Sequence, residues 1–150
     1  MIAPAIATRP AVDDDLAFIV DCFLRAMRPS LTAWRGDWNE PRERARFERA
    51  LDLASTSIIE VDAAGVGFVM IVELPRALQV HTIAIAPEYQ GRGIGSEIVA
   101  DLINIGRQTG RHVVLSVLKA NPRAAALYLR LGFQVVEETE YYHHLRWTAR

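Results

Sequence analysis

The sequence contains a single cysteine, Cys22, and a single lysine, Lys119, among its 150 residues. One cysteine excludes a disulfide within the chain, which is typical of proteins kept in a reducing compartment. Long apolar runs are also missing, because no window approaches the ~20 apolar residues that a membrane span requires. Residues 1–15 lack the basic start and apolar core of a secretory signal. We therefore expect a cytoplasmic protein with no membrane partner.

A large charge of either sign is absent as well. The formal net charge is −1 at pH 7, so no overall field attracts nucleic acid, and none is expected as a partner. Apolar side chains, in contrast, make up 51% of the residues. A chain of this length and composition can bury its own core, so we expect one domain over residues 1–150.

Hydrophobic periodicity and turn residues predict the element order β-α-α-β-β-β-α-β-α-β-β. Strands are expected within residues 5–11, 78–87, 111–120 and 133–147 (two strands), with a hairpin over 56–74. Helices are expected at 13–27, 40–54, 93–110 and 121–132, and residues 30–41 are predicted to be a loop. Interleaved strands and helices indicate an α/β fold, in which helices flank a mixed sheet.

Three glycines within five residues, Gly91, Gly93 and Gly95, stand between a predicted strand and a predicted helix. Bare backbone N–H groups at the start of a helix, with its partial positive charge, favour a bound phosphate. The alternative is a tight turn with no ligand. The spacing is neither the G-x-G-x-x-G dinucleotide pattern nor a P-loop.

Two segments together resemble the GNAT superfamily of N-acetyltransferases. "QGRGIG", from Gln90 to Gly95, is similar to the family motif [RQ]-x-x-G-x-[GA]. "NPRAAALYLRLGF", from Asn121 to Phe133, resembles the second family segment, an Asn followed by a helix that carries Tyr and ends in Leu-Gly-Phe. The resemblance implies a mostly antiparallel sheet, flanked by helices, whose strands splay at a cofactor cleft. It also implies transfer of an acetyl group from acetyl-CoA to an amine, and no metal.

The resemblance further assigns roles to individual residues. Tyr128 would lie near the thioester sulfur and assist the departing thiolate, and Asn121, seven residues earlier, would face the same side of its helix. The cofactor would be bound by the strand and loop residues Ile83, Ala84, Ile85, Gln90, Gly91, Arg92, Gly93, Ile94, Gly95 and Ser96, together with Asn121. For Tyr128 the alternative is a buried aromatic side chain with no role in catalysis.

The group that deprotonates the amine is less evident. Family members often carry a glutamate where this chain has Gln79 or Ser116, and neither of these can act as a base near neutral pH. His81 is the main candidate, because alternation along a strand would place it on one face with Gln79, Ile83 and Ile85. A histidine hydrogen-bonded within the sheet face is the alternative, and Glu73 is a second candidate base.

The acceptor is expected to be a small-molecule amine or a peptide α-amine, because a weak base serves an amine of low pKa more readily. Trp34 and Trp38, with the acids Asp37 and Glu40, could bind a cationic amine, or could simply anchor a loop. The last predicted strand carries four side chains on one face that could line the pocket or pack in the core: Tyr141, His143, Leu145 and Trp147. His143 and the adjacent His144 would point to opposite faces and make a poor metal pair. A non-catalytic acetyl-CoA sensor and a homodimer formed through the last strand both stay open.

Overall fold

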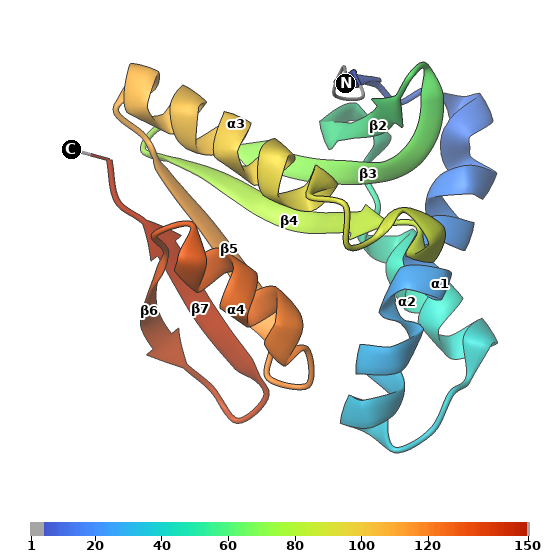
Figure 1. Cartoon of the computed structure of the whole chain (residues 1–150). Coiled ribbons are helices and arrows are strands. Elements are labelled where there is room, and N and C mark those ends of the chain that lie inside the picture. Colours follow the sequence, from blue (N-terminus) through green and yellow to red (C-terminus); the bar gives the residue numbers. More distant parts are fainter. Residues whose placement is uncertain (1–4, 150) are drawn as a thin grey trace.

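The computed structural model describes residues 5–149, and its elements follow the predicted order (Figure 1). The strands are β1 (Ile6–Pro10), β2 (Thr56–Val61), β3 (Ala64–Glu73), β4 (Ala77–Ile85), β5 (His112–Leu118), β6 (Gln134–Glu138) and β7 (Tyr142–Trp147). The helices are α1 (Leu16–Arg35), α2 (Glu40–Ala50), α3 (Ile94–Thr109) and α4 (Pro122–Arg130). Short 3-10 turns occupy Asp13–Asp15, Leu53–Ser55 and Pro87–Tyr89.

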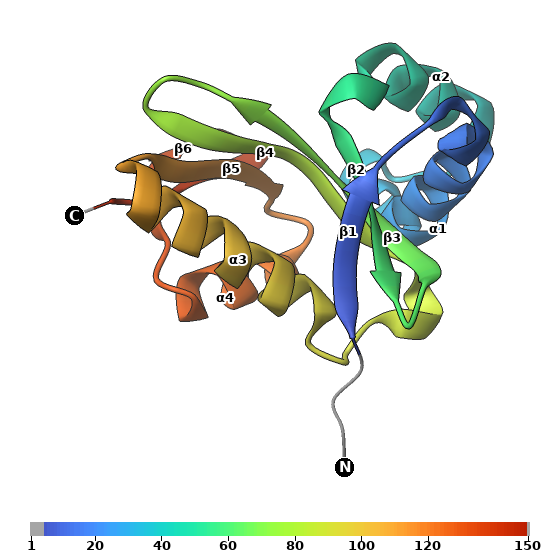
Figure 2. The ribbon, with the colours of Figure 1, turned by 90° about the horizontal axis from the view of Figure 1, so that it is seen from above.

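All seven strands form one sheet in the order β1-β2-β3-β4-β5-β7-β6. Every neighbouring pair is antiparallel except β4 and β5, which are parallel. Helices α3 and α4 lie on one side of the sheet, and α1 and α2 lie on the other (Figure 2). The predicted mixed, mostly antiparallel sheet flanked by helices is confirmed.

The parallel pair separates part of the way along. The β4–β5 ladder runs from Ala77–His112 to Val80–Leu115 and then stops, although β4 continues to Ile85 and β5 to Leu118. Figure 1 shows the two strands diverging toward the N-terminal end of α3. Beyond Val80, the edge of β4 that faces β5 therefore has no partner strand within the described chain, and this divergence opens the sheet.

A β-bulge lies at the same level of β4. The register passes from Met70–Thr82 to Ile71–Val80, so His81 is the extra residue. A bulge re-aims the side chains that follow it, and the alternation expected along β4 changes here. Ile83 and Ile85 pack with the core that contains Val80, which is the face opposite to Gln79. The predicted common face of Gln79 with Ile83 and Ile85 is therefore wrong, and His81, as the extra residue, does not follow the expected alternation.

Each face of the sheet has its own core. On the α3 and α4 side, Val99, Val113 and Leu145 are fully buried. On the α1 and α2 side, Ile19 and Phe68 are fully buried and belong to a second cluster. These apolar side chains hold both layers of helices against the sheet, since burying one such side chain contributes about 1.5–3 kcal/mol.

Helix α1 is longer than predicted. The segment 30–41 was expected to be a loop that follows Pro29, but the helix continues through this proline to Arg35. Ser30 and Leu31 are both buried, and their packing offsets the hydrogen bond that a proline removes from a helix interior. The helix ends instead at Gly36, whose φ of +81° suits the left-handed cap.

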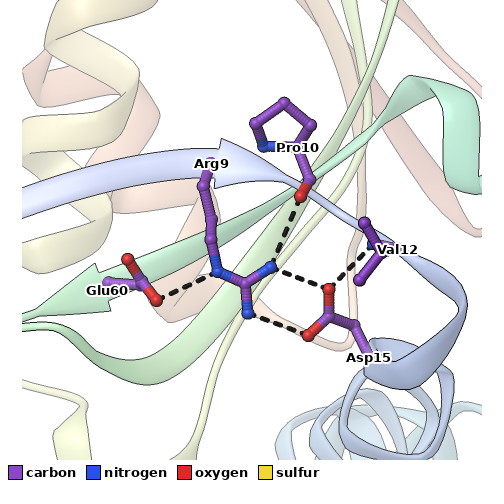
Figure 3. A network of polar contacts seen from close by, with 5 residues as sticks. All are labelled: Arg9, Pro10, Val12, Asp15 and Glu60. Atoms are coloured by element: carbon purple, nitrogen blue, oxygen red, sulfur yellow. Dashed lines mark hydrogen bonds and ion pairs between the residues drawn. The ribbon is translucent and has the colours of Figure 1, made fainter.

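An arginine ties the first strand to the start of α1. Arg9 donates to both carboxylate oxygens of Asp15, at 2.8 and 2.9 Å, and its Nε donates to Glu60 at 3.1 Å (Figure 3). Asp15 also accepts from the backbone N–H of Val12 at 2.8 Å. The bonds from Arg9, followed by the bond from Val12, lower the pKa of Asp15 to about 2.

We expect Asp15→Asn to lower the melting temperature at pH 7, and the difference from the native chain to fade in acid. A carboxyl with a lowered pKa stabilises the fold above its unfolded pKa, about 3.9, and loses that contribution as the pH falls toward 2. Thermal melts between pH 7 and pH 2 measure the difference. Asp14→Asn, at an exposed neighbour, is the control. An equal difference at both ends of the range would contradict the ion pair.

Candidate active site

A cleft of about 580 Å³ opens where β4 and β5 diverge. Its walls come from α1, the end of β4, the glycine loop with the start of α3, and α4, so it lies between helices that cover opposite faces of the sheet. Every residue predicted to bind the cofactor lines this cleft except Arg92; they are Ile83, Ala84, Ile85, Gln90, Gly91, Gly93, Ile94, Gly95, Ser96 and Asn121.

The glycine loop presents bare backbone to the cleft. Gly91 and Gly93 have φ values of +76° and +81°, which side chains rarely allow. Gly93 is the N-cap of α3 and provides no side chain to bond the first N–H groups of the helix. A Cβ added at Gly93 or Gly95 would meet no atom within 4 Å. The uncapped helix start therefore has room for an anionic group and suits a pyrophosphate.

The arginines near this loop differ from the prediction. Arg92 does not line the cleft; its guanidinium donates to the carbonyl of Glu88 at 3.0 Å and lies over the Tyr89 ring. Two arginines of α4 line the cleft instead, Arg123 and Arg130. The Arg123 guanidinium lies close to Gly91, 3.4 Å from where its Cβ would be. An arginine on a short amphipathic helix carries no sequence signal that it faces a ligand.

Helix α4 brings Asn121 and Tyr128 to the cleft. Asn121 is the N-cap, and its side chain accepts from the N–H of Ala124 at 3.3 Å. Pro122 follows at the first helical position, and both residues are typical of a helix start. Tyr128 is 7% exposed and packs edge-on against Phe133, with ring centroids 5.7 Å apart. Burial raises the pKa of Tyr128 to about 12, so its phenol stays protonated and remains a hydrogen-bond donor.

The two predicted bases lie outside the cleft lining. His81 is exposed on the bulge, and its Nδ1 is 2.9 Å from Oγ1 of Thr82. Glu73 ends β3 beside Leu78 at the opposite end of β4, where Arg111 pairs with it at 3.1 Å. Of the two, His81 is the nearer in the chain to the point where β4 leaves β5.

The tryptophans of α1 and the following loop are already covered by arginines. The Arg35 guanidinium lies 4.2 Å from the Trp34 ring centroid, and that of Arg28 lies 5.2 Å from the Trp38 ring centroid. The nearby acids are also paired. Arg42 bonds Asp37 at 2.8 Å, and Arg44 lies 3.9 Å from Glu40. These rings and acids therefore offer little to a cationic ligand.

An aromatic row joins the end of α1 to β7. The ring of Trp34 lies 5.6 Å from that of Tyr141 and 6.0 Å from that of Tyr142, and Tyr142 stacks on His144. On the other face of β7, Leu145 is buried and Trp147 packs against the same core. For these two residues, core packing is the interpretation that the structure supports.

Two negative observations hold for the described residues. Between residues 5 and 149, no group of three or more His, Cys, Asp and Glu side chains could hold a metal ion. None of the helices in that range has the length and apolar character that crossing a membrane requires.

This combination of a splayed sheet, an uncapped glycine loop and a buried tyrosine defines an acyl-CoA-binding class of fold. The model of the acetyltransferase (GNAT) family matches residues 23–133, and the chain belongs to this family. The predicted resemblance is confirmed.

Individual relatives agree with this assignment. The N-alpha-acetyltransferase RimI of Mycobacterium tuberculosis is 36% identical over 104 residues, which are 65% of each protein. The thialysine N-epsilon-acetyltransferase of Bos taurus is 38% identical over 72 residues, 47% of this chain and 42% of that protein. The chain spans less than two thirds of the length of these relatives. The structure of PaiA N-acetyltransferase from Thermoplasma acidophilum in complex with coenzyme A has a TM-score of 0.67 at 18% identity, and covers 96% of this chain and 99% of that one.

Proposed function

We propose that residues 1–150 form a single catalytic domain that transfers an acetyl group from acetyl-CoA to a primary amine. The amine attacks the thioester directly, with both substrates bound together. The observation that carries the proposal is the cleft between β4 and β5, which joins an uncapped helix start at Gly93 to the phenol of Tyr128. The helix start at Gly93 suits a pyrophosphate, and the phenol of Tyr128 suits a leaving thiolate.

The glycine loop and α4 together bind the donor in this proposal. The N–H groups from Gly91 to Ser96 bond the pyrophosphate, and Arg123 adds positive charge beside Gly91. The unpaired edge of β4, from Ile83 to Ile85, offers backbone groups to the extended arm of the donor. Asn121 lines the same cleft and contacts that arm. A backbone N–H near Ile85 bonds the oxygen of the attacked carbonyl.

Tyr128 stabilises the thiolate by hydrogen bonding. An ordinary thiol has a pKa of about 8.5, well below the value of about 12 to which burial raises the pKa of Tyr128. Complete proton transfer from the phenol to the sulfur is therefore unfavourable. A fixed hydrogen bond gains most when charge develops on sulfur, which is in the transition state.

The acceptor in this proposal is an α-amine of a peptide or a small molecule. At pH 7, deprotonating a lysine-type amine costs about 4.6 kcal/mol, whereas an α-amine costs about 1.1 kcal/mol. Positions 79 and 116 carry Gln79 and Ser116, so neither provides a carboxylate base for an amine of high pKa. An arginine lies over each of Trp34 and Trp38, so these rings are less open to a cationic polyamine. RimI, which acetylates N-alpha groups by its name, is among the relatives.

An acceptor panel tests this function. Short peptides with free α-amines, single amino acids, α-blocked lysine peptides and polyamines are each mixed with acetyl-CoA, and thiol release is measured. We expect α-amines to react at least tenfold faster than lysine side chains and polyamines. Faster reaction of the polyamines would refute the acceptor class. Coenzyme A binding without transfer to any amine would instead favour a non-catalytic sensor.

A further inference from the structure

A serine and a histidine face each other on the side of the sheet opposite to α3 and α4. Oγ of Ser116 lies 2.5 Å from Nδ1 of His144. The two residues are direct partners in the antiparallel ladder of β5 and β7, which places their side chains on one face. A hydroxyl can donate one hydrogen bond while it accepts another. Ser116 can therefore bond the imidazole and a third group at the same time.

The pair stands where the sheet opens. The last pair of the β4–β5 ladder is Val80 with Leu115, so Ser116 is the first residue of β5 beyond it. Leu115 and Val117 point into the core on the α3 side, and Ser116 between them therefore points to the opposite face, where it is exposed. Ser116 and His144 do not line the cleft itself, so the pair would act on an amine that approaches the opening from this face.

The imidazole is held in a fixed orientation. The rings of Tyr142 and His144 lie 6.3 Å apart and are nearly parallel, at 14°, and Tyr142 in turn meets Trp34 edge-on. The charged residues nearest in register on this face are Glu137 of β6, opposite His144, and Arg146 of β7, two residues on. The contact with Ser116 and the neighbouring ring of Tyr142 are thus the two interactions that orient the imidazole.

We propose that Ser116 and His144 form a relay that takes the proton from the attacking amine, a role that rests on the proposed acetyl transfer. The ammonium form of the amine first gives one N–H proton to Oγ of Ser116, and the hydroxyl proton of Ser116 passes to Nδ1 of neutral His144. The neutral amine nitrogen then bonds to the acetyl carbon. The carbon–sulfur bond breaks, its electron pair leaves on the sulfur that Tyr128 hydrogen-bonds, and the second N–H proton passes to that sulfur. Histidine suits this task because its charge changes near neutral pH.

The pH dependence of kcat/KM tests the relay, with acetyl-CoA and the fastest α-amine peptide as substrates. We expect His144→Gln to lower kcat/KM about tenfold at pH 7 and less than twofold at pH 9. The loss is modest because an α-amine, with a pKa of about 7.8, is already partly neutral at pH 7. Ser116→Ala should give the same profile, Ser116→Thr should restore activity, and the double variant should lose no more than either single one.

Two further variants separate the relay from other causes. His112→Gln is the matched control, since its imidazole lies at the other end of β5 and accepts from the N–H of Ala149; its activity should not change. His81→Gln should keep the native pH profile. If His81→Gln removes the pH dependence while His144→Gln retains it, the relay assignment is wrong. A loss of equal size at pH 7 and pH 9, or no rescue by Ser116→Thr, would also overturn it.

The same measurements distinguish this proposal from the proposed function. If the native chain acetylates no amine at either pH, the failure lies in the proposed function. If the native chain is active and His144→Gln matches it at pH 7, the failure lies in the relay alone. Should His144→Gln unfold, as judged by its melting temperature, His144→Asn and Ser116→Ala provide the comparison.

Discussion

Tyr128→Phe is expected to lower kcat about 100-fold, the usual effect of losing one positioned hydrogen-bond donor or acid. The substitution keeps the ring, which is buried against Phe133, and removes only the hydroxyl. The melting temperature should therefore change little. Coenzyme A affinity should fall much less than kcat, because the lost bond is strongest when charge sits on sulfur.

Two measurements separate this role from core packing. An acyl thioester with a better leaving group needs less help from the phenol, so the defect of Tyr128→Phe should shrink with such a donor. Burial raises the pKa of Tyr128 to about 12, so the native rate should show no decline from phenol ionisation between pH 8 and pH 10. If the Phe variant turns over at the native rate while chemistry limits the reaction, Tyr128 is only a core residue.

The elements around this site are predictable where their signals are local. The helix that carries Tyr128 begins at an Asn-Pro pair and ends before Gly132, whose φ is +100°. The β2–β3 hairpin turns at Asp62 and Ala63, which both have positive φ, within the hairpin predicted over residues 56–74. Each of these signals acts over a few residues, so it survives in the sequence without knowledge of the tertiary fold.

The errors arise where distant packing decides. Helix α1 crosses Pro29 because Ser30 and Leu31 are buried, and no local signal shows that burial. The bulge at His81 is a mismatch of register between β3 and β4, which cannot be read from β4 alone. Strict alternation therefore assigned Ile83 and Ile85 to the wrong face.

The cleft itself depends on the same distant effects. The loop and strand residues that line the cleft were predictable because the family motif identifies them in the sequence. The arginines Arg123 and Arg130 were not, because they line the cleft only as a result of how α4 is oriented. Ser116 and His144 lie 28 residues apart and meet through the β5–β7 register. In the sequence, Ser116 only shows that the glutamate common in the family is absent. The contact of Ser116 with the imidazole of His144 is seen only in the structure.

Gly93→Val is expected to weaken coenzyme A binding about 100-fold. The side chain would stand in open space that belongs to the cleft, where the proposed pyrophosphate meets the first N–H groups of α3. Losing two charge-assisted hydrogen bonds, at about 1.5 kcal/mol each, corresponds to this change. A β-branched residue at a φ of +81° also strains the backbone, by about 1–3 kcal/mol, so the fold needs its own control.

Gly110→Val provides that control at the other end of the same helix. Gly110 is the C-cap of α3, has a φ of +67°, and likewise has no atom within 4 Å of an added Cβ. Both variants should lose similar thermal stability, because both place valine in the left-handed region. Calorimetric titration with coenzyme A should show weakened binding for Gly93→Val alone. Equal affinities in the two variants would mean that the open helix start of α3 does not hold the pyrophosphate.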